Sequence, residues 1–171
     1  MKLAEEKKVV LVASDLNLAT GATQVTKGIN MKGYHHATFL ISFGTIGSDN
    51  VTLRATSGAA DLAVTSDLPF KYAYGASTCI FAGAGTTPAA GADVLAAETT
   101  VVAATGLVVL QATYSNHMLV VEVDASIMDI ANGEEWLSLE FTDGGSATGL
   151  VTIFAILEPR YTGNLSATAL A

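Results

Sequence analysis

Hydrophobic and polar residues alternate along most of the chain with a period of two, which is typical of β-strands. In HATFLISFG, Phe39, Ile41 and Phe43 alternate with Thr, Leu and Ser. In MLVVEVD, three aliphatic side chains stand opposite Glu122 and Asp124. Both segments are therefore predicted to be strands with one buried face.

A second strand follows the first after the turn signal GSDN. In VTLRAT, Val51 and Leu53 point to one face, and Arg54 and Thr56 point to the other. Two strand patterns separated by a short polar turn are typical of a hairpin. We therefore predict that residues 36–44 and 51–56 pair with each other.

Further strands are indicated in the middle of the chain. LPFKYAYG places Phe70, Tyr72 and Tyr74 on one face. TTVVAATGLVVLQATY is predicted to contain two short strands separated near Gly106. Residues 82–100 overlap its start, are poor in large side chains, and are expected to form a long loop.

The last third of the chain carries the strongest strand patterns. WLSLEFTD directs Leu137, Leu139 and Phe141 inward, and Ser138 and Glu140 outward. GLVTIFAILEPRY is apolar on both faces, which indicates a strand that is central in its sheet or covered by another subunit. Before these strands, DASIMDIANG is predicted to form a short helical turn that ends at an Asn–Gly pair.

Seven to nine short strands, with turn signals about ten residues apart, predict an all-β, antiparallel, jelly-roll-like sandwich with one short helical turn. We expect residues 1–15 to form an N-terminal arm or first strand, and residues 16–163 to form a single sandwich domain. Residues 164–171 are expected to be a tail that is mobile alone or held by a neighbouring subunit.

Half of the 171 residues are hydrophobic and only 14% are charged, with a mean hydropathy of +0.45. Polar residues interrupt every apolar run, so no membrane-spanning segment is expected. Glu5 and Glu6 in the first segment argue against an export signal. The excess of apolar residues instead predicts surface that other subunits cover, while the lone Cys79 is interpreted as a small buried side chain.

The net charge of −8 is unevenly distributed. Residues 1–80 hold seven of the eight Lys and Arg residues, whereas residues 81–171 hold only Arg160 against ten acids. Nucleic-acid binding requires clustered basic residues that neutralise phosphates, and the chain has no such cluster. Nucleic acid and membrane are therefore not expected as partners.

The adjacent His35 and His36 raise the question of a metal or acid–base site. On an extended strand they point to opposite faces and cannot bind one metal together, and the remaining His117 lies far away in the sequence. Zinc sites use three or four ligands with characteristic spacing, which the chain lacks. We predict no metal site, and interpret both histidines as the opening of a core strand.

Several acidic residues are candidates for a glycosidase pair or a calcium site. They mostly occupy solvent-facing strand positions or turns, and no spaced calcium loop, nucleophile elbow or phosphate loop is present. We therefore expect no enzymatic activity, no catalytic residue and no cofactor. The acids considered are Asp49, Glu122, Asp124, Asp129, Glu134, Glu135, Glu140 and Asp143.

Three segments resemble a family of small tailed-phage proteins that decorate the capsid head. The segments are NMKGYHHATFLISFG, NHMLVVEVDASIMDIANGEEWLSLEFTD and VTIFAILEPRYTG, which contain the stronger predicted strands. The residues that carry the resemblance most distinctly are Tyr34, His35, Val123, Asp124, Ala125, Ala131, Asn132, Gly133, Arg160 and Tyr161. Residues 56–115 do not contribute to it.

The resemblance implies a structural decoration, or cement, protein that is assembled in the host cytoplasm and located on the outer capsid surface. Such proteins are often trimers that bridge neighbouring subunits of the major capsid protein. Several weak contacts made by one oligomer give strong attachment, because the later contacts are intramolecular. An acidic second half suits a position outside the shell better than one facing packaged DNA.

The expected capsid or subunit contacts lie near the two ends of the chain and at one aromatic residue. They are Lys2, Lys7, Lys8, Trp136, Arg160 and Tyr161. For Arg160 and Tyr161, intramolecular roles remain an equal alternative. An alternative function is a virion-surface module that binds host glycans around Trp136 or residues 82–100, since aromatic side chains stack on sugars.

Overall fold

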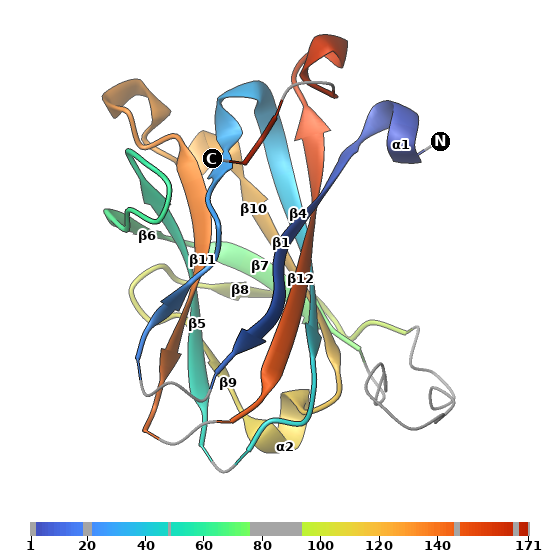
Figure 1. The fold of residues 1–171 in the computed structure, drawn as a ribbon, viewed down its shortest axis with the longest axis vertical. Helices are drawn as coiled ribbons and strands as arrows, with labels where there is room; N and C mark the ends of the chain where they lie inside the picture. Colours follow the sequence, from blue (N-terminus) through green and yellow to red (C-terminus); the bar gives the residue numbers. More distant parts are fainter. Residues whose placement is uncertain are drawn as a thin grey trace.

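The computed structural model describes residues 3–18, 22–47, 49–75, 94–145, 148–165 and 168–170. In this part of the chain, twelve strands form two antiparallel sheets that face each other as a sandwich (Figure 1). The predicted sandwich is therefore confirmed. The described residues contain more strands than the seven to nine expected, because several strands are only two or three residues long.

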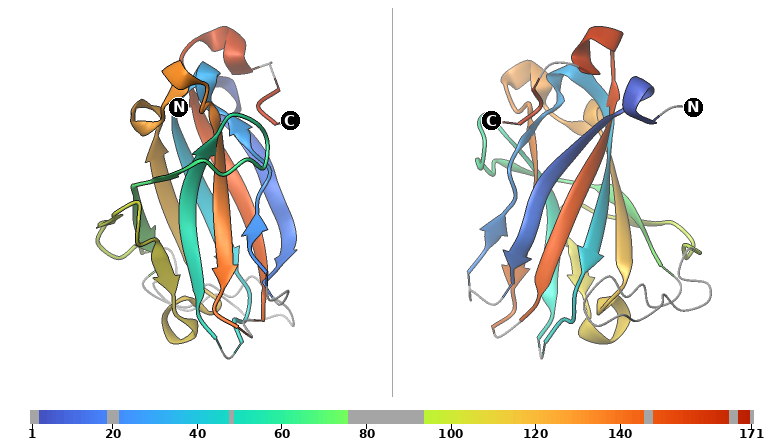
Figure 2. Two further views of the ribbon diagram at one scale, coloured as in Figure 1. Left: turned by 90° about the vertical axis from the view of Figure 1, so that its left-hand side faces the viewer. Right: turned by 45° about the vertical axis from the view of Figure 1, so that its right-hand side comes forward.

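The first sheet, sheet A, carries the long central strands. Its strand β1 lies along β12 at one edge (Figure 2), and β8 forms the other edge. Across the sheet the strands are β1 (Lys8–Asn17), β12 (Leu150–Pro159), β4 (Tyr34–Phe43), β10 (Met118–Asp124), β7 (Phe70–Tyr74) and β8 (Thr99–Val101).

The second sheet, sheet B, is built around β11 and β5, which pair over eight residues. Four strands of two or three residues each flank this pair, so the edges of sheet B are formed by short strands. The strands are β2 (Gln24–Val25), β3 (Ile29–Asn30), β11 (Trp136–Asp143), β5 (Val51–Gly58), β6 (Ser66–Leu68) and β9 (Leu107–Val109).

Short helical segments lie at the two ends of the sandwich. The predicted helical turn is present as two 3-10 turns, η2 (Ala125–Ile127) and η3 (Ile130–Asn132), and Gly133 ends the second with φ of 91°. Figure 2 shows both turns at the same end as α1 (Leu3–Glu6), η1 (Met31–Gly33) and η4 (Thr162–Leu165), whereas α2 (Gln111–Tyr114) lies at the other end.

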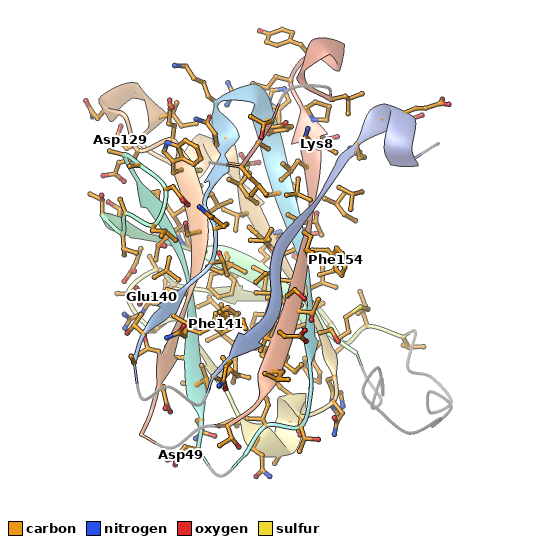
Figure 3. All side chains as sticks on the ribbon, in the orientation of Figure 1. Lys8, Asp49, Asp129, Glu140, Phe141 and Phe154 are labelled. Carbon is orange, nitrogen blue, oxygen red and sulfur yellow. The ribbon has the colours of Figure 1, made fainter. Side chains whose placement is uncertain are left out.

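The core lies between the two sheets and contains the apolar positions that alternation predicted. Phe39 and Ile41 of β4 are fully buried, and so are Leu119 of β10 and Leu139 of β11. Phe141 lies between the sheets in Figure 3. Burying each such side chain contributes about 1.5–3 kcal/mol relative to leaving it exposed, so these strands provide much of the stability of the fold.

The predicted hairpin of β4 and β5 is wrong. β4 pairs with β10 and β12 in sheet A, whereas β5 pairs with β6, β9 and β11 in sheet B. The connection between them crosses from one sheet to the other. Strands that face each other across a core have the same alternating pattern as strands that pair edge to edge, so the pattern did not distinguish the two arrangements.

Two polar side chains predicted to face solvent are buried. Thr56 and Ser138 point away from the core, yet they are only 0% and 1% exposed. They are directly opposite each other in the β5–β11 pair, and the Thr56 hydroxyl donates to the Ser138 carbonyl at 3.4 Å. The Ser138 hydroxyl itself is buried without a hydrogen-bond partner among the described residues, so only the Thr56 hydroxyl is satisfied at this covered position.

The C-terminal segment is held by the chain itself, contrary to the expectation of a mobile tail or one held by a neighbour. Leu170 forms a β-bridge with Ile29, and the Asn30 backbone N–H donates to the Ala169 carbonyl at 2.9 Å. Ala169 is buried. These contacts fix the last described residues against β3.

Some predictions concern residues outside the described ranges. Lys2, Cys79 and residues 82–93 of the expected loop are among them. Of the rest of that loop, Thr99 and Thr100 begin β8. The predicted break between β8 and β9 near Gly106 is confirmed, although the end of that segment forms α2. Among the described residues, no helix is long and apolar enough to cross a membrane.

Candidate functional site

The two histidines lie at a β-bulge where β4 begins. His36 pairs with Glu158 of β12, but the next pair joins Tyr34 to Pro159, so His35 is the additional residue. A bulge redirects the side chain that it inserts. His35 is exposed, and the simple expectation that the two rings lie on opposite faces of a regular strand does not hold here.

Both histidines lie close enough to two carboxylates to influence them. The pKa of Asp124 is lowered mainly by hydrogen bonds from the Ser126 backbone and hydroxyl, and further by the two histidines. The pKa of Glu158 is lowered by its hydrogen bond with Lys7 and again by the histidines. The histidines thus lie beside a cluster of charged side chains.

This cluster continues across sheet A as a row of charged side chains, which we call the charged row. Lys7 forms an ion pair with Glu158, and His36 Nε2 lies 3.9 Å from Glu122 Oε2. Beyond them, Lys71 Nζ binds Glu98 Oε1 at 2.9 Å. The charged row runs obliquely across the strands, because Lys71 is in register with Glu122 and not with Asp124. It consists of Lys7, Glu158, His36, Asp124, Glu122, Lys71 and Glu98.

Most of the acidic residues considered for catalysis have structural partners, whereas Glu122 and Asp124 both line one hollow on the surface of sheet A. Glu134 accepts hydrogen bonds from the Ser57 and Ser66 hydroxyls at 2.7 and 3.2 Å. Glu135 accepts one from Asn30 at 2.9 Å. Within the described ranges, no three His, Cys, Asp or Glu side chains are placed to hold a metal ion.

Next to the charged row, the outer face of sheet A is apolar. Registered strand pairs place Leu11, Phe154, Leu40, Val120 and Ala73 in one line across five strands, which we call the apolar row. Leu11 is 49% exposed and Phe154 is 42% exposed. In Figure 3, Phe154 lies on the opposite side of β12 from Phe141 of the core.

The apolar row extends along the strands as well. Val9 and Leu150 are about half exposed, and Ile156 is partly exposed. A large apolar patch of this kind is typical of a protein–protein contact. The sequence predicted that β12 carries apolar side chains on both of its faces, and the structure confirms this.

Two hollows interrupt this outer face. One, of about 300 Å³, lies beside Phe154 and is lined by Leu40, Ser42, Met118 and Thr152. The other, of about 260 Å³, lies over Ala73 near the β8 edge. Its further lining residues are Tyr72, Leu95, Ala96, Glu98, Val120 and Glu122.

A third hollow, of about 310 Å³, lies at the charged row. Its apolar wall is formed by Pro69, Phe70 and Ile127, and its polar rim includes His36 and Lys71. The carboxylates of Glu122 and Asp124 also line it, so the charged row passes along this hollow.

Four of the contact residues predicted from the sequence lie at one end of the sandwich. Lys7 binds Glu158, and Lys8 donates to the Leu165 carbonyl of η4 at 3.2 Å. Arg160 donates from Nε to the Tyr34 carbonyl at 3.0 Å, so it has the intramolecular role considered as an alternative. Tyr161 is 75% exposed beside it.

Trp136 lies at the start of β11, opposite Asn30 and Gly58. A β-carbon added to Gly28 would lie 3.2 Å from its ring atom Cε3, so the indole covers Gly28. Two tyrosines also pack against each other within the chain, since the rings of Tyr74 and Tyr114 form an edge-to-face pair with centroids 5.3 Å apart. These rings therefore contribute to packing within the chain.

Sequence reasoning did not identify the apolar row and the charged row as surfaces. Their members come from strands that are distant in the sequence, and only the strand order and register bring them together on one face. The one available signal was β12, whose apolar residues on both faces required a cover on each side.

No family model and no curated protein matches the chain. Among solved structures, the chain is similar to the SPBc2 prophage-derived protein YomS. The two are 12% identical, with a TM-score of 0.40 over 89% of this chain and 92% of that one. A likeness this distant carries no argument about family or function.

Proposed function

We propose that the protein is a structural component of a phage virion, located on the outer surface of the capsid, where it bridges subunits of the major capsid protein. The observation that carries the proposal is the exposed apolar outer face of sheet A, with Leu11 on the edge strand β1 and Phe154 on its neighbour β12. A surface of this kind is buried when copies assemble on a larger particle.

The resemblance described above supports the same conclusion. Its three segments form β4, β10, β11 and β12, which are the long strands at the centre of both sheets. They also include Arg160 and Tyr161 at the end of the sandwich. The segments that carry the resemblance therefore form both the central strands and an exposed end of the sandwich.

The exposed end is the proposed capsid contact. Arg160 is fixed by hydrogen bonds to the carbonyls of Gly33 and Tyr34, which holds Tyr161 on a rigid base. Exposed aromatic side chains on rigid supports contribute strongly to protein interfaces, because little side-chain entropy is lost on binding. Attachment needs no catalysis, cofactor, nucleic acid or membrane.

Tyr161→Ala tests this contact. We expect the variant to fold normally, because the side chain is 75% exposed, and to bind particles at least about tenfold more weakly. The measurement is co-sedimentation of the purified chain with capsids assembled without it. Val102→Ala, which shortens another exposed side chain (66%) elsewhere, is the control and should bind normally.

Unchanged attachment of the Tyr161→Ala variant would remove this contact from the proposal. Failure of the unmodified chain to co-sediment with the capsids would contradict the function itself.

A further inference from the structure

The connection between β5 and β6, residues 59–65, exposes apolar side chains where loops are normally polar. This β5–β6 loop has the sequence AADLAVT, in which Leu62 is 52% exposed and Val64 is 43% exposed. Most loop tips carry Gly, Pro, Asn, Asp or Ser instead. In both views of Figure 2 the loop, drawn in green, lies toward the end of the sandwich that carries η4. It therefore presents an apolar tip near the proposed capsid contact.

The backbone of Leu62 is strained. Its φ is 63°, in the left-handed region. The other non-glycine residues of the described ranges with positive φ are Asp15 and Asn116, whose short polar side chains make this conformation easier to adopt. A leucine gains no such help, and its half-exposed side chain offsets little of the cost by packing on its own chain.

Hydrogen bonds to one carboxylate hold Leu62 in this conformation. Asp61 Oδ1 accepts from the Gly28 backbone N–H at 2.7 Å, and Asp61 Oδ2 binds Lys27 Nζ at 2.7 Å. The backbone N–H of Leu62 donates to the same carboxylate. The tip of the loop is thus fixed before any partner arrives, so little conformational entropy is lost on binding.

One short segment of the chain supports both this loop and the proposed capsid contact. Gly28 holds the β5–β6 loop, while the carbonyls of Gly33 and Tyr34 accept hydrogen bonds from Arg160, next to Tyr161. A chain advances at most about 3.6 Å per residue, so the two supports lie within about 22 Å of each other. Two exposed side chains are therefore mounted on one rigid frame.

We propose that the β5–β6 loop is a second capsid contact, in which Leu62 inserts into an apolar pocket of the shell subunit next to the one bound by Tyr161. This inference rests on the proposed function, because a protein that bridges two subunits needs two contacts. The pocket is apolar, since the one charged side chain of the loop, Asp61, is already paired with Lys27. The second contact strengthens attachment because it forms within an existing complex.

Leu62→Asn tests the contact without straining the fold. Asparagine adopts the left-handed conformation more readily than leucine, so the urea midpoint of the purified chain should stay the same or rise. Co-sedimentation with capsids assembled without the protein should nevertheless be at least about tenfold weaker, because burying a leucine side chain on binding is worth that much or more.

Leu110→Asn is the matched control. It makes the same chemical change at a leucine that is 43% exposed and precedes α2, at the opposite end of the sandwich. Asparagine is favoured at the position before a helix, so this variant should fold. Its attachment to capsids should be normal.

The stability of saturated particles tests bridging separately from attachment. Capsids saturated with the unmodified chain should disassemble at a higher temperature than bare capsids. Capsids saturated with the Leu62→Asn variant should disassemble at the temperature of bare capsids, because each variant chain is then held to a single subunit through Tyr161.

The outcomes separate this contact from the function on which it rests. Failure of the unmodified chain to attach would overturn both. Normal attachment of the Leu62→Asn variant would overturn the second contact alone, and so would a lowered urea midpoint, which would mean that the Leu62 side chain stabilises its own chain. Particles stabilised by the saturating variant would show that Leu62 does not bridge subunits.

Discussion

The adjacent histidines show how a small backbone irregularity changes the role of individual residues. A regular strand would place His35 and His36 on opposite faces, but the bulge at His35 leaves both rings near the carboxylates of Asp124 and Glu158. Their neighbours are charges of the same surface and not a set of metal ligands. Sequence alone identified the strand start, but not the bulge, because no residue type in GYHH requires one.

Changing His35 and His36 together to Gln should leave the fold and particle attachment intact. Glutamine keeps a polar group near Glu122, and neither ring lies in the core. Thermal unfolding and co-sedimentation with capsids measure the two properties. Loss of attachment by a normally folded variant would show that the histidines take part in binding the particle.

Asp124 provides a residue-scale test that depends on pH. Its Oδ1 accepts from the Ser126 backbone N–H at 2.7 Å at the start of η2, and this bond lowers its pKa. A carboxyl whose pKa is lowered by folding stabilises the protein above its ordinary pKa of about 3.9, and loses that effect as the pH falls further.

Asp124→Ala should therefore reduce the free energy of unfolding by about 1 kcal/mol at pH 7. The difference between wild type and variant should shrink as the pH falls below about 4, as measured by urea denaturation. Asp124→Asn is the matched control, because it keeps an acceptor for Ser126 but does not titrate. An equal loss for Asp124→Ala at pH 7 and pH 3 would contradict this explanation.

At the scale of elements, the sequence predicted buried faces well and strand partners poorly. Phe39 and Leu53 were expected to be buried, and both are. Their strands, however, belong to different sheets. Alternation reports which side of a strand meets the core, whereas pairing depends on connections and long-range register that a local pattern does not contain.

The C-terminal segment shows the same limit. A short stretch of small residues gives no local signal of order, yet Leu170 and Ala169 dock on β3 through contacts with residues 29 and 30. The relevant information is the match between two segments at opposite ends of the chain. Such matches were not visible from periodicity.

Gly106, between β8 and β9, tests a turn that the sequence did identify. Its φ is 64°, and an added β-carbon would lie 2.9 Å from the Leu53 carbonyl oxygen and from Arg54 Cγ. Gly106→Ala should therefore combine the cost of the left-handed backbone, about 1–2 kcal/mol, with a steric clash.

Gly133→Ala is the control for the Gly106 prediction. Its φ is 91°, but an added β-carbon would meet nothing within 4 Å, so only the backbone cost applies. Urea denaturation should show a larger loss of stability for Gly106→Ala than for Gly133→Ala. Equal losses would mean that the clash next to Leu53 is relieved without cost.

At the scale of the whole molecule, the main feature is an apolar outer face on an otherwise ordinary sandwich. The sequence indicated it only through the excess of apolar residues and the two-sided pattern of β12. The charged row and the hollow over Ala73 required the complete strand order. Of the contacts predicted from sequence, Arg160 bonds within the chain and Tyr161 is exposed, as the proposed capsid contact requires.

The measurement that tests the central claim most directly is an electron cryo-microscopy map of intact particles produced from the genome that encodes this chain. We predict density for the two-sheet sandwich on the outside of the head, with the end that carries Tyr161 against the shell and the outer face of sheet A covered by protein. A map in which this density is absent from the head, or in which that face is open to solvent, would contradict the account.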